Sequence, residues 1–178
     1  KNISCVICRP EHVSQIPSGL SGIVTSQYPK AVFFKIHNYL LTQKEPFPSE
    51  ISPSAKISSH AYIAPTNVKI GENVEIGPFV CIFENTIIEN NVRICAGSII
   101  GGQSFNNVEF PGEGNFLVRD AGRTIIRENA EICSICHIAC GTLEQDATII
   151  GRHCKMDALV HIGRGTVVGD RTLLPAGV

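Results

Sequence analysis

Aliphatic residues recur at every sixth position over most of the chain. One extra residue precedes Ile70, and a twelve-residue step precedes Ile150. The repeating positions are Ile51, Ile57, Ile63, Ile70, Ile76, Ile82, Ile88, Ile94 and Ile100, and then Ile126, Ile132, Ile138, Ile150, Met156, Ile162, Val168 and Leu174. A period of six is neither the 3.6 of a helix nor the 2 of a half-buried strand, so it indicates a structural repeat.

A second marker has the same period. The residue four positions after each aliphatic is small or β-branched in nearly every repeat, as at Ala55, Val74 and Ser98, with Asn67 as the exception. Glycine often follows the aliphatic directly, where it permits tight turning. These features predict one short strand per hexapeptide and three strands per coil of about 18 residues. We therefore predict an all-β fold, a left-handed parallel β-helix whose aliphatic and small positions point inward.

An antiparallel β-sandwich is the alternative for a chain of short strands. It would need alternation with period two and hairpin turns between strands. Seventeen positions on one lattice of six favour the β-helix instead.

Two segments lie outside the lattice. Residues 1–45 are predicted to form a small α/β domain, with strands near Ile3–Ile7 and Ile23–Thr25 and a helix over Pro29–Leu41 that starts at a proline. The apolar face expected for this helix carries Val32, Ile36, Tyr39 and Leu40.

The β-helix is predicted over residues 46–178, with an insertion at 101–124 that is rich in Gly and Asn. The lattice stops at Ile100 and resumes at Ile126, so this segment must loop out of the coil. Long loops on rigid scaffolds commonly carry function.

Charge and hydropathy narrow the function. The formal net charge is -1 and no basic block is present, so nucleic acid and anionic membranes are not expected partners. No apolar run approaches the roughly 18–20 residues of a membrane span, and no signal peptide is visible. We expect a cytoplasmic protein. Its first residue is Lys1 rather than Met, which predicts a processed or shortened chain.

Eight cysteines raise the question of disulfides or a metal. Without a secretory signal, and with a chain long enough to bury a core, a disulfide framework is not expected. Cys5 and Cys8 would point to opposite faces of a strand. Cys136 fits the small interior position, as does Cys154, whereas Cys133 and Cys140 do not. We therefore predict no metal site.

Several stretches together resemble the UDP-3-O-acylglucosamine N-acyltransferases of lipid A synthesis. The stretches are "VTSQYPKAVFFKI" in the first domain, "ISPSAKI" at entry into the repeats, "IIGGQSF" before the insertion and "GRTIIRENAEICS" after it. The resemblance extends over essentially the whole chain.

The resemblance implies a homotrimer with active sites between subunits and no bound cofactor. The donor would be an acyl group on the phosphopantetheine of acyl carrier protein, or acyl-CoA. The acceptor would be the amine of a UDP-linked glucosamine derivative. Phe33 and Tyr28 would lie near the uracil, although the family usually has Asn in place of Tyr28.

The chain departs from the family near the chemistry. The family's catalytic histidine matches Arg164, in "HIGRGTVVG", and arginine stays protonated, so it cannot accept a proton. The family's acidic residue in the preceding coil matches Ala139, and its basic neighbour matches Cys140. The segment "HIACGTLEQDAT" is also longer than the family pattern.

Acyl transfer to an amine needs a general base, for which histidine is suited at neutral pH. His161 is the leading replacement base because it lies three residues from Arg164, and His137 is the next candidate. Arg164 could instead bind a phosphate or carboxylate. Phe105 and Asn106 in the insertion could shape an acyl or pantetheine channel. Surface or interface roles for the histidines, and simple loop packing for the other two, are the alternatives.

Three functions therefore remain open. The leading one is transfer of an acyl group from acyl carrier protein to a UDP-linked amino sugar. The second is an acetyl-CoA-dependent sugar acetyltransferase. The third is a catalytically silent homologue used for binding or assembly.

Overall fold

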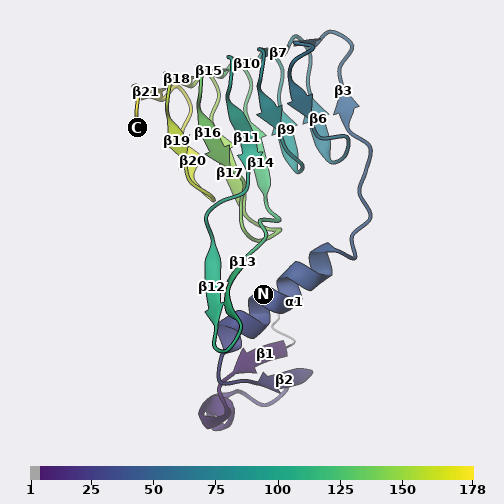
Figure 1. Ribbon diagram of the computed structural model, residues 1–178, viewed down its shortest axis with the longest axis vertical. Helices are drawn as coiled ribbons and strands as arrows, with labels where there is room; N and C mark the ends of the chain where they lie inside the picture. The colour runs from purple at the N-terminus through teal and green to yellow at the C-terminus, as the bar shows by residue number, and fades with distance from the viewer. Residues whose placement is uncertain (1–4) are drawn as a thin grey trace. The chain divides into compact units, whose positions relative to one another are not determined.

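The computed structural model describes residues 5–178, and most of them form a left-handed parallel β-helix (Figure 1). Its short strands stack into three parallel sheets, called here the first, second and third face. The first face contains β3 (Glu50–Ile51), β6 (Val68–Ile70), β9 (Thr86–Ile88), β14 (Arg123–Ile126), β17 (Ala147–Ile150) and β20 (Val167–Val168). The second face contains β4 (Lys56–Ile57), β7 (Glu75–Ile76), β10 (Arg93–Ile94), β15 (Glu131–Ile132), β18 (Lys155–Met156) and β21 (Leu173–Leu174). The third face contains β5 (Tyr62–Ile63), β8 (Cys81–Ile82), β11 (Ile99–Gly102), β16 (His137–Ala139) and β19 (His161–Ile162).

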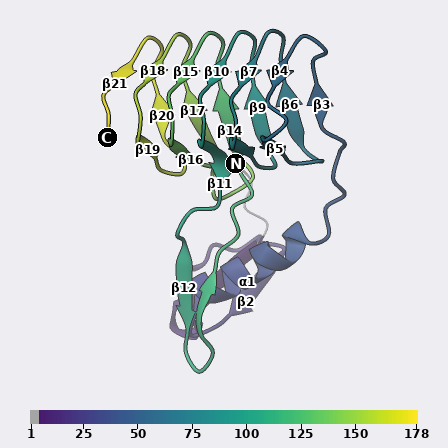
Figure 2. The same ribbon diagram turned by 45° about the horizontal axis from the view of Figure 1, so that its top comes forward.

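The interior of the β-helix is made by the two repeat positions that the sequence marks. Ile76, Ile94 and Ile132 are at most 3% exposed, and they pair in register across β7, β10 and β15. The small positions between them are buried as well, including Cys136 and Cys154. The predicted fold class and register are thereby confirmed. The coils stack one against the next (Figure 2). Their buried side chains form one continuous hydrophobic cluster.

The corners of the coils use the left-handed backbone region. Three residues after most repeat aliphatics, φ is positive, near +60°. Asparagine occupies many of these corners, and it tolerates this region better than other non-glycine residues. The corner residues with positive φ are Asn67, Asn73, Phe79, Asn85, Asn91, Gly97, Asn129, Ile135, His153, Leu159, Gly165, Arg171 and Gly177.

Ile135 is the least suited of these corner residues. It is β-branched, has φ of 59° and is 62% exposed, so its side chain gains little from burial. We expect Ile135→Asn to raise the free energy of unfolding by about 1 kcal/mol, because asparagine relieves the left-handed strain. Thermal unfolding of the two proteins measures this. Ile149→Asn, at a strand position, serves as the matched control and should destabilise; a loss of stability in Ile135→Asn would contradict the strain argument.

The three faces differ in what they present outward. The second face carries charged side chains, with ion pairs from Lys56 to Glu75 at 3.0 Å and from Lys155 to Glu131. The outward positions of the first face are apolar in its later coils: Ile87, Ile125, Ile149 and Val167. The third face presents Tyr62, Cys81, Ile99, His137 and His161.

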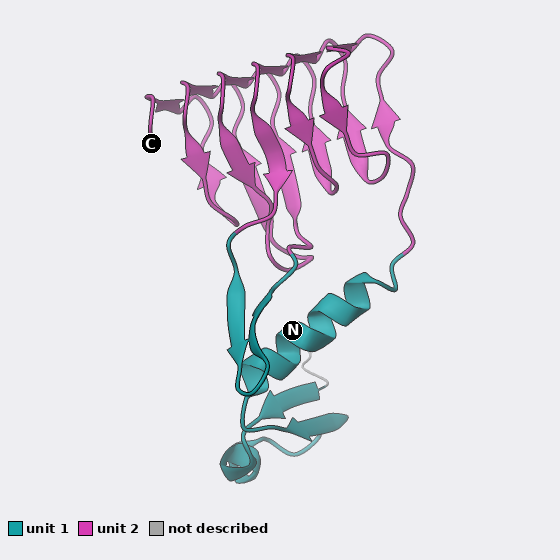
Figure 3. Ribbon diagram, in the orientation of Figure 1, with its two compact units in different colours: residues 1–44, 105–119 teal, residues 45–104, 120–178 magenta. Residues whose placement is uncertain are grey.

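The chain divides into two compact units (Figure 3). The β-helix unit comprises residues 45–104 and 120–178, and the other comprises residues 1–44 and 105–119. Sequence analysis treated 101–124 as an insertion of the β-helix. Its middle part instead groups with the N-terminal segment, which the spacing along the chain does not reveal.

The smaller unit has parallel strands β1 (Cys5–Cys8) and β2 (Gly22–Thr25), the 3-10 helix η1 (Pro10–Gln15), and α1 (Pro29–Leu41). The bounds of α1 match the prediction. Ile3, assigned to the first strand from sequence, lies outside the described residues. The middle of the insertion forms an antiparallel hairpin of β12 (Asn107–Phe110) and β13 (Gly114–Leu117).

The hairpin packs on α1, and this contact corrects the apolar face expected for the helix. Ala31 is buried with Val108 and Val118 of the hairpin segment, and Phe34 packs against this cluster. Ile36, Tyr39 and Leu40, which sequence analysis placed on the apolar face, are 42%, 64% and 54% exposed. The prediction was wrong because the polar side chains of α1 contact the hairpin too.

Those polar contacts fix the register between helix and hairpin. The Lys35 ammonium lies 2.6 Å from a Glu113 carboxylate oxygen and 3.9 Å from the centroid of the Phe110 ring. Asn38 donates to the Leu117 carbonyl at 2.8 Å and accepts from the Arg119 N–H at 2.9 Å.

Candidate functional site

The insertion and the twelve-residue step both occur at one corner of the β-helix, where the third face turns into the first. The insertion leaves after β11 and returns before β14, while the longer segment lies between β16 and β17. The two segments lie side by side: the Ala121 N–H donates to the Thr142 carbonyl at 2.9 Å and Gly122 to Gly141 at 2.8 Å. A side chain on Gly122 would lie 2.6 Å from the Gly141 Cα, so this approach requires glycine. The irregular corner is the candidate site.

The two histidines proposed as alternative bases lie together beside this corner. His137 and His161 are register partners on β16 and β19. Their rings stack, with centroids 5.0 Å apart and planes 11° from parallel. His161 is exposed and His137 is half-buried. The structure therefore brings the pair together on the third face, whereas sequence analysis weighed each one separately.

His137 is held against the backbone of the neighbouring coil. A Cβ added at Gly102 would lie 2.6 Å from its Nε2, so the missing side chain of Gly102 makes room for the imidazole. Its Nδ1 is buried and has no hydrogen-bond partner among the described residues. Burial, and then the neighbouring His161 imidazole, hold the pKa of His137 below its ordinary value. The ring is accordingly neutral at pH 7, as a base must be.

This lowered pKa predicts an acid-dependent loss of stability. Below about pH 6.5, His137 is protonated in the unfolded chain but not in the folded protein. The free energy of unfolding therefore decreases as the pH is lowered, by up to about 1.4 kcal/mol per pH unit, until the pH reaches the pKa of His137 in the folded protein. We expect the Tm difference between pH 7.5 and pH 5.5 to shrink in His137→Gln. His153→Gln, at an exposed corner, should behave as the wild type. Equal pH dependence in all three proteins would contradict a buried neutral His137.

Asp120 anchors the neck of the insertion. One of its carboxylate oxygens, Oδ2, accepts from the Ser104 N–H at 2.6 Å, the Ser104 hydroxyl at 2.5 Å and the Gln103 side-chain amide at 2.8 Å. Its Oδ1 is buried with no partner among the described residues. An orphaned buried acceptor calls for an explanation such as a water or a ligand group. The sequence analysis did not select Asp120. The signal that could have found it is its position at one end of the insertion, because the two ends of an insertion lie close together and polar residues there can bond to each other.

Cys140 lies next to Asp120, at the position where the resembling family has a basic residue. Burial raises the pKa of the Cys140 thiol to about 12, and the Asp120 carboxylate adds to this. The thiol is therefore protonated at neutral pH and serves neither as a base nor as a nucleophile. Ala139, in place of the family's acidic residue, is fully buried.

Arg164 occupies the same corner one coil later. It follows β19 at the repeat position that Cys140 occupies after β16, and it is exposed. The N–H of the next residue, Gly165, donates to the Thr148 hydroxyl at 2.9 Å. A guanidinium at this corner suits an anionic group of a substrate rather than proton abstraction.

The four other predicted substrate contacts lie in the smaller unit. Tyr28 precedes α1 and packs edge-on against Phe110, with ring centroids 5.7 Å apart, and Phe33 contacts Phe34 in the same way at 5.1 Å. Asn106 is half-buried, and its carbonyl accepts from the Val118 N–H. The Phe105 side chain is 94% exposed.

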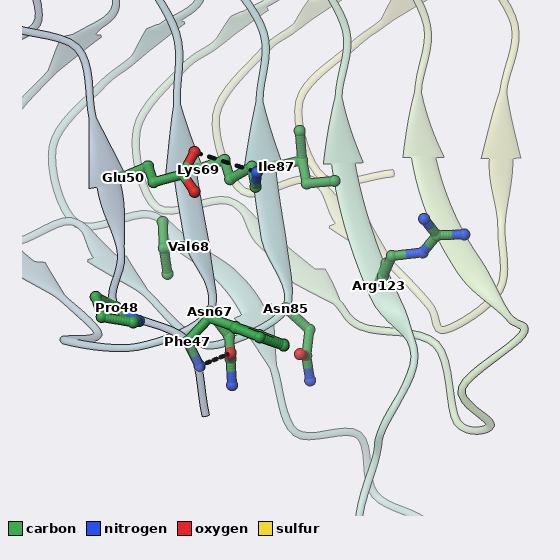
Figure 4. A pocket seen from close by; sticks show the side chains of 9 residues that line it. All are labelled: Phe47, Pro48, Glu50, Asn67, Val68, Lys69, Asn85, Ile87 and Arg123. Atoms are coloured by element: carbon green, nitrogen blue, oxygen red, sulfur yellow. Dashed lines mark hydrogen bonds and ion pairs between the residues drawn. The ribbon is translucent and has the colours of Figure 1, made fainter. Parts of the chain in front are cut away.

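A groove of about 450 Å³ lies on the first face, near the start of the β-helix (Figure 4). Its polar side chains are the amides of Asn67 and Asn85, the carboxylate of Glu50 and the cations of Lys69 and Arg123. Lys69 pairs with Glu50 at 3.1 Å, whereas Arg123 has no ion-pair partner among the described residues. Its apolar walls are Phe47, Pro48, Val68 and Ile87. The groove is on a different face from the histidine pair, and the sequence analysis did not single out its residues.

Neither a metal centre nor a membrane span emerges within residues 5–178. No three His, Cys, Asp or Glu side chains there are grouped so that they could hold a metal ion. No helix in that range is long and apolar enough to cross a bilayer.

Comparison with known families agrees with the repeat register. The profile of the family described as bacterial transferase hexapeptide (six repeats) matches residues 67–102, which are six successive hexapeptides of the β-helix. Residues 67–102 therefore carry the hexapeptide repeat of that family. The match covers the regular coils that precede the irregular corner.

The chain is also similar to a protein named as an acyltransferase. The chain is 33% identical over 154 residues to a UDP-3-O-acylglucosamine N-acyltransferase of Helicobacter pylori, an alignment that covers 71% of this chain and 44% of that protein. The chain thus spans less than half the length of this relative.

Two solved structures of transferases are similar to parts of this chain. A UDP-N-acetylglucosamine acyltransferase of Francisella novicida superposes with a TM-score of 0.47 and 28% identity, over 68% of this chain and 44% of that one. The acetyltransferase domain of PglB from Neisseria gonorrhoeae superposes with a TM-score of 0.44 and 13% identity, over 87% and 60%.

Proposed function

We propose that this chain is an acyltransferase that moves an acyl group from the phosphopantetheine thioester of acyl carrier protein to the amine of a UDP-linked glucosamine derivative. The observation that carries the proposal is the 33% identity to a UDP-3-O-acylglucosamine N-acyltransferase over 154 residues. The stacked pair of His137 and His161 beside an irregular corner, with the pKa of His137 held below its ordinary value, supports it.

In the proposed reaction the amine attacks the thioester carbonyl while a base accepts its proton. His161 is the proposed base because its ring is exposed to a substrate, and His137 stacks behind it as a neutral partner. Arg164 would hold a phosphate or carboxylate of the substrate. The oxyanion needs donors as well, and the corner backbone is the nearest source of N–H groups.

The smaller unit would recognise the nucleotide and the donor. Tyr28 and Phe33 present aromatic surface that is 44% exposed in each case, which suits stacking on a uracil ring. Phe105 and Asn106 would border the path of the acyl or pantetheine chain.

One incubation series tests the proposal. A UDP-linked 3-O-acylglucosamine is mixed with the protein and either acyl-acyl carrier protein or a set of acyl-CoA thioesters, and products are identified by mass spectrometry. N-acylated product with acyl carrier protein supports the proposal. Product only with acetyl-CoA favours a sugar acetyltransferase instead, and no product with any donor favours a silent homologue.

The silent homologue, the third function left open by the sequence, is kept as an alternative because three positions depart together. Arg164, Ala139 and Cys140 replace the residues that the resembling family uses for proton transfer and its support. Arg164→His distinguishes decay of the site from a rebuilt one. A gain of activity in this variant, with an inactive wild type, would identify Arg164 as the lesion.

A homotrimer is proposed from the three faces of the β-helix. The second face is covered by charged side chains and suits solvent, whereas the first face presents a ladder of isoleucines and the third presents Tyr62, Cys81 and Ile99. Contiguous apolar surface of this kind marks interaction sites. Packing of first against third faces around a threefold axis would cover both and place the histidine pair at a subunit boundary.

We expect sedimentation velocity at micromolar concentration to give a species of three chains. Ile149→Arg, on the outward ladder of the first face, should lower the mass toward one chain, because a charge would be buried without a partner. Glu131→Arg, on the charged second face, is the matched control and should leave the assembly intact. A monomer in the wild type would refute this packing.

A further inference from the structure

Two cysteines occupy the same repeat position on neighbouring coils. Cys95 follows β10 and Cys133 follows β15, directly after the register partners Ile94 and Ile132. The Cys95 N–H donates to the Ile132 carbonyl at 2.8 Å, so the ladder continues into this corner. Neighbouring parallel strands hold their Cα atoms about 4.8 Å apart, within the roughly 4.4–6.8 Å that a disulfide spans. The backbone therefore has the spacing of a disulfide before any thiol is considered.

The two side chains leave the same repeat position on paired coils, and the Cys95 thiol is close enough to contribute to the raised pKa of Cys133. Burial, and then the Cys95 thiol and the Asp157 carboxylate, raise the pKa of Cys133. Both cysteines are reduced and half-buried, so a small reagent can reach the pair from solvent.

The other thiols near this corner are engaged elsewhere. The Cys136 thiol is buried and donates to the Asp157 carbonyl at 3.1 Å, and the Cys154 thiol donates to the Gly169 carbonyl at 2.9 Å. Both fill the interior of the coil. Cys95 and Cys133 are therefore the pair of thiols that this part of the β-helix presents to solvent. Within residues 5–178, they belong to no group of side chains that could hold a metal ion.

We propose that Cys95 and Cys133 are an oxidation site that closes into a disulfide between adjacent coils when the protein meets a small-molecule disulfide. In the first step the Cys95 thiolate attacks one sulfur of the reagent, and the other half of the reagent leaves as a thiol. In the second step Cys133, after losing its proton, attacks the Cys95 sulfur and releases the second half. Two protein thiols are oxidised and one disulfide reagent is reduced to two thiols, so electrons and protons balance.

Closure would brace the part of the β-helix that the insertion interrupts. The coil segment between Cys95 and Cys133 contains the whole insertion, so the bond closes a long loop of the unfolded chain, and long loops gain most from a cross-link. The bond would hold together the two coils on either side of the break. This inference does not depend on the proposed acyl transfer.

The test uses the whole chain and oxidised glutathione. After incubation, free thiols are blocked with an alkylating reagent and the protein is digested under non-reducing conditions for mass spectrometry. We expect a linked peptide pair that contains Cys95 and Cys133, lighter by two hydrogens, and a Tm higher by on the order of 5–10 °C that dithiothreitol reverses. The linked pair should form faster as pH rises, because the raised pKa of Cys133 limits its thiolate.

Matched variants distinguish the pair from general thiol oxidation. Cys95→Ser and Cys133→Ser should each abolish the Tm rise and leave one glutathione on the remaining sulfur. Cys81→Ser, which removes a half-buried thiol from the third face, should retain both the linked peptide and the Tm rise. Alkylation of Cys95 and Cys133 as separate thiols after exhaustive treatment of the folded wild type would overturn the proposal, as would a Tm rise that persists in Cys133→Ser.

Discussion

Replacing His161 by alanine is expected to lower kcat for acyl transfer by about 100- to 10,000-fold, with little change in KM. General bases typically contribute this much, and the exposed ring of His161 is the one that a substrate amine can reach. The folded state should persist, because the side chain lies on the outer surface and the core partner is Ile162. Steady-state kinetics with the donor found active in the incubation series measures the effect.

The stacked partner provides the internal comparison. His137→Ala should lower the rate less if His161 is the base, since His137 acts on it only through ring contact. His153→Ala, at an exposed corner of another face, should have wild-type kinetics. An unaffected His161→Ala with an inactive His137→Ala would assign the base to His137 instead.

Placing a charge in the core is expected to abolish folding. Ile132 is fully buried and pairs with Ile94 and Met156 in the central column, so Ile132→Asp would remove an apolar side chain and bury a carboxylate without a partner. Each part costs several kcal/mol, and their sum approaches the total stability of a typical domain, about 5–15 kcal/mol. We expect insoluble protein or no cooperative thermal transition.

A control variant at Ile135, three residues away, tests whether the position of the aspartate or only its presence causes the loss of folding. Ile135→Asp introduces the same charge at a corner that is exposed and left-handed, where aspartate is tolerated. This variant should be soluble, with a Tm at or above that of the wild type. A soluble Ile132→Asp with an unchanged Tm would show that the assigned register is incorrect.

The positions of the buried side chains and of the helix could be predicted from the sequence. The six-residue period fixes which side chains point inward, because each coil repeats the same three corners, and Ile76, Ile94 and Ile132 are buried as expected. The helix over Pro29–Leu41 is equally local, since proline sets its first turn. These features depend on the backbone period and on propensity, which a sequence contains.

The apolar face of α1 shows where this reasoning fails. Its partner is the hairpin of residues 107–117, which is distant in sequence, and the contact is made by Phe34 together with Lys35 and Asn38. The hydrophobic period placed Ile36, Tyr39 and Leu40 on the buried face of α1. It could not predict that polar side chains of the helix contact the hairpin.

The sequence predicted only some of the residues of the candidate site. Sequence alone determined that this chain forms a hexapeptide β-helix with an insertion, and that His137, His161 and Arg164 follow one repeat register. Tertiary structure alone decided that the insertion and the longer segment share a corner, that the two imidazoles stack, and that Asp120 closes the neck beside Cys140. The physical reason is the irregular spacing between Ile100 and Ile150. A period predicts contacts only while it holds, and where the chain leaves the lattice its neighbours are set by hydrogen bonds and close glycine contacts across coils.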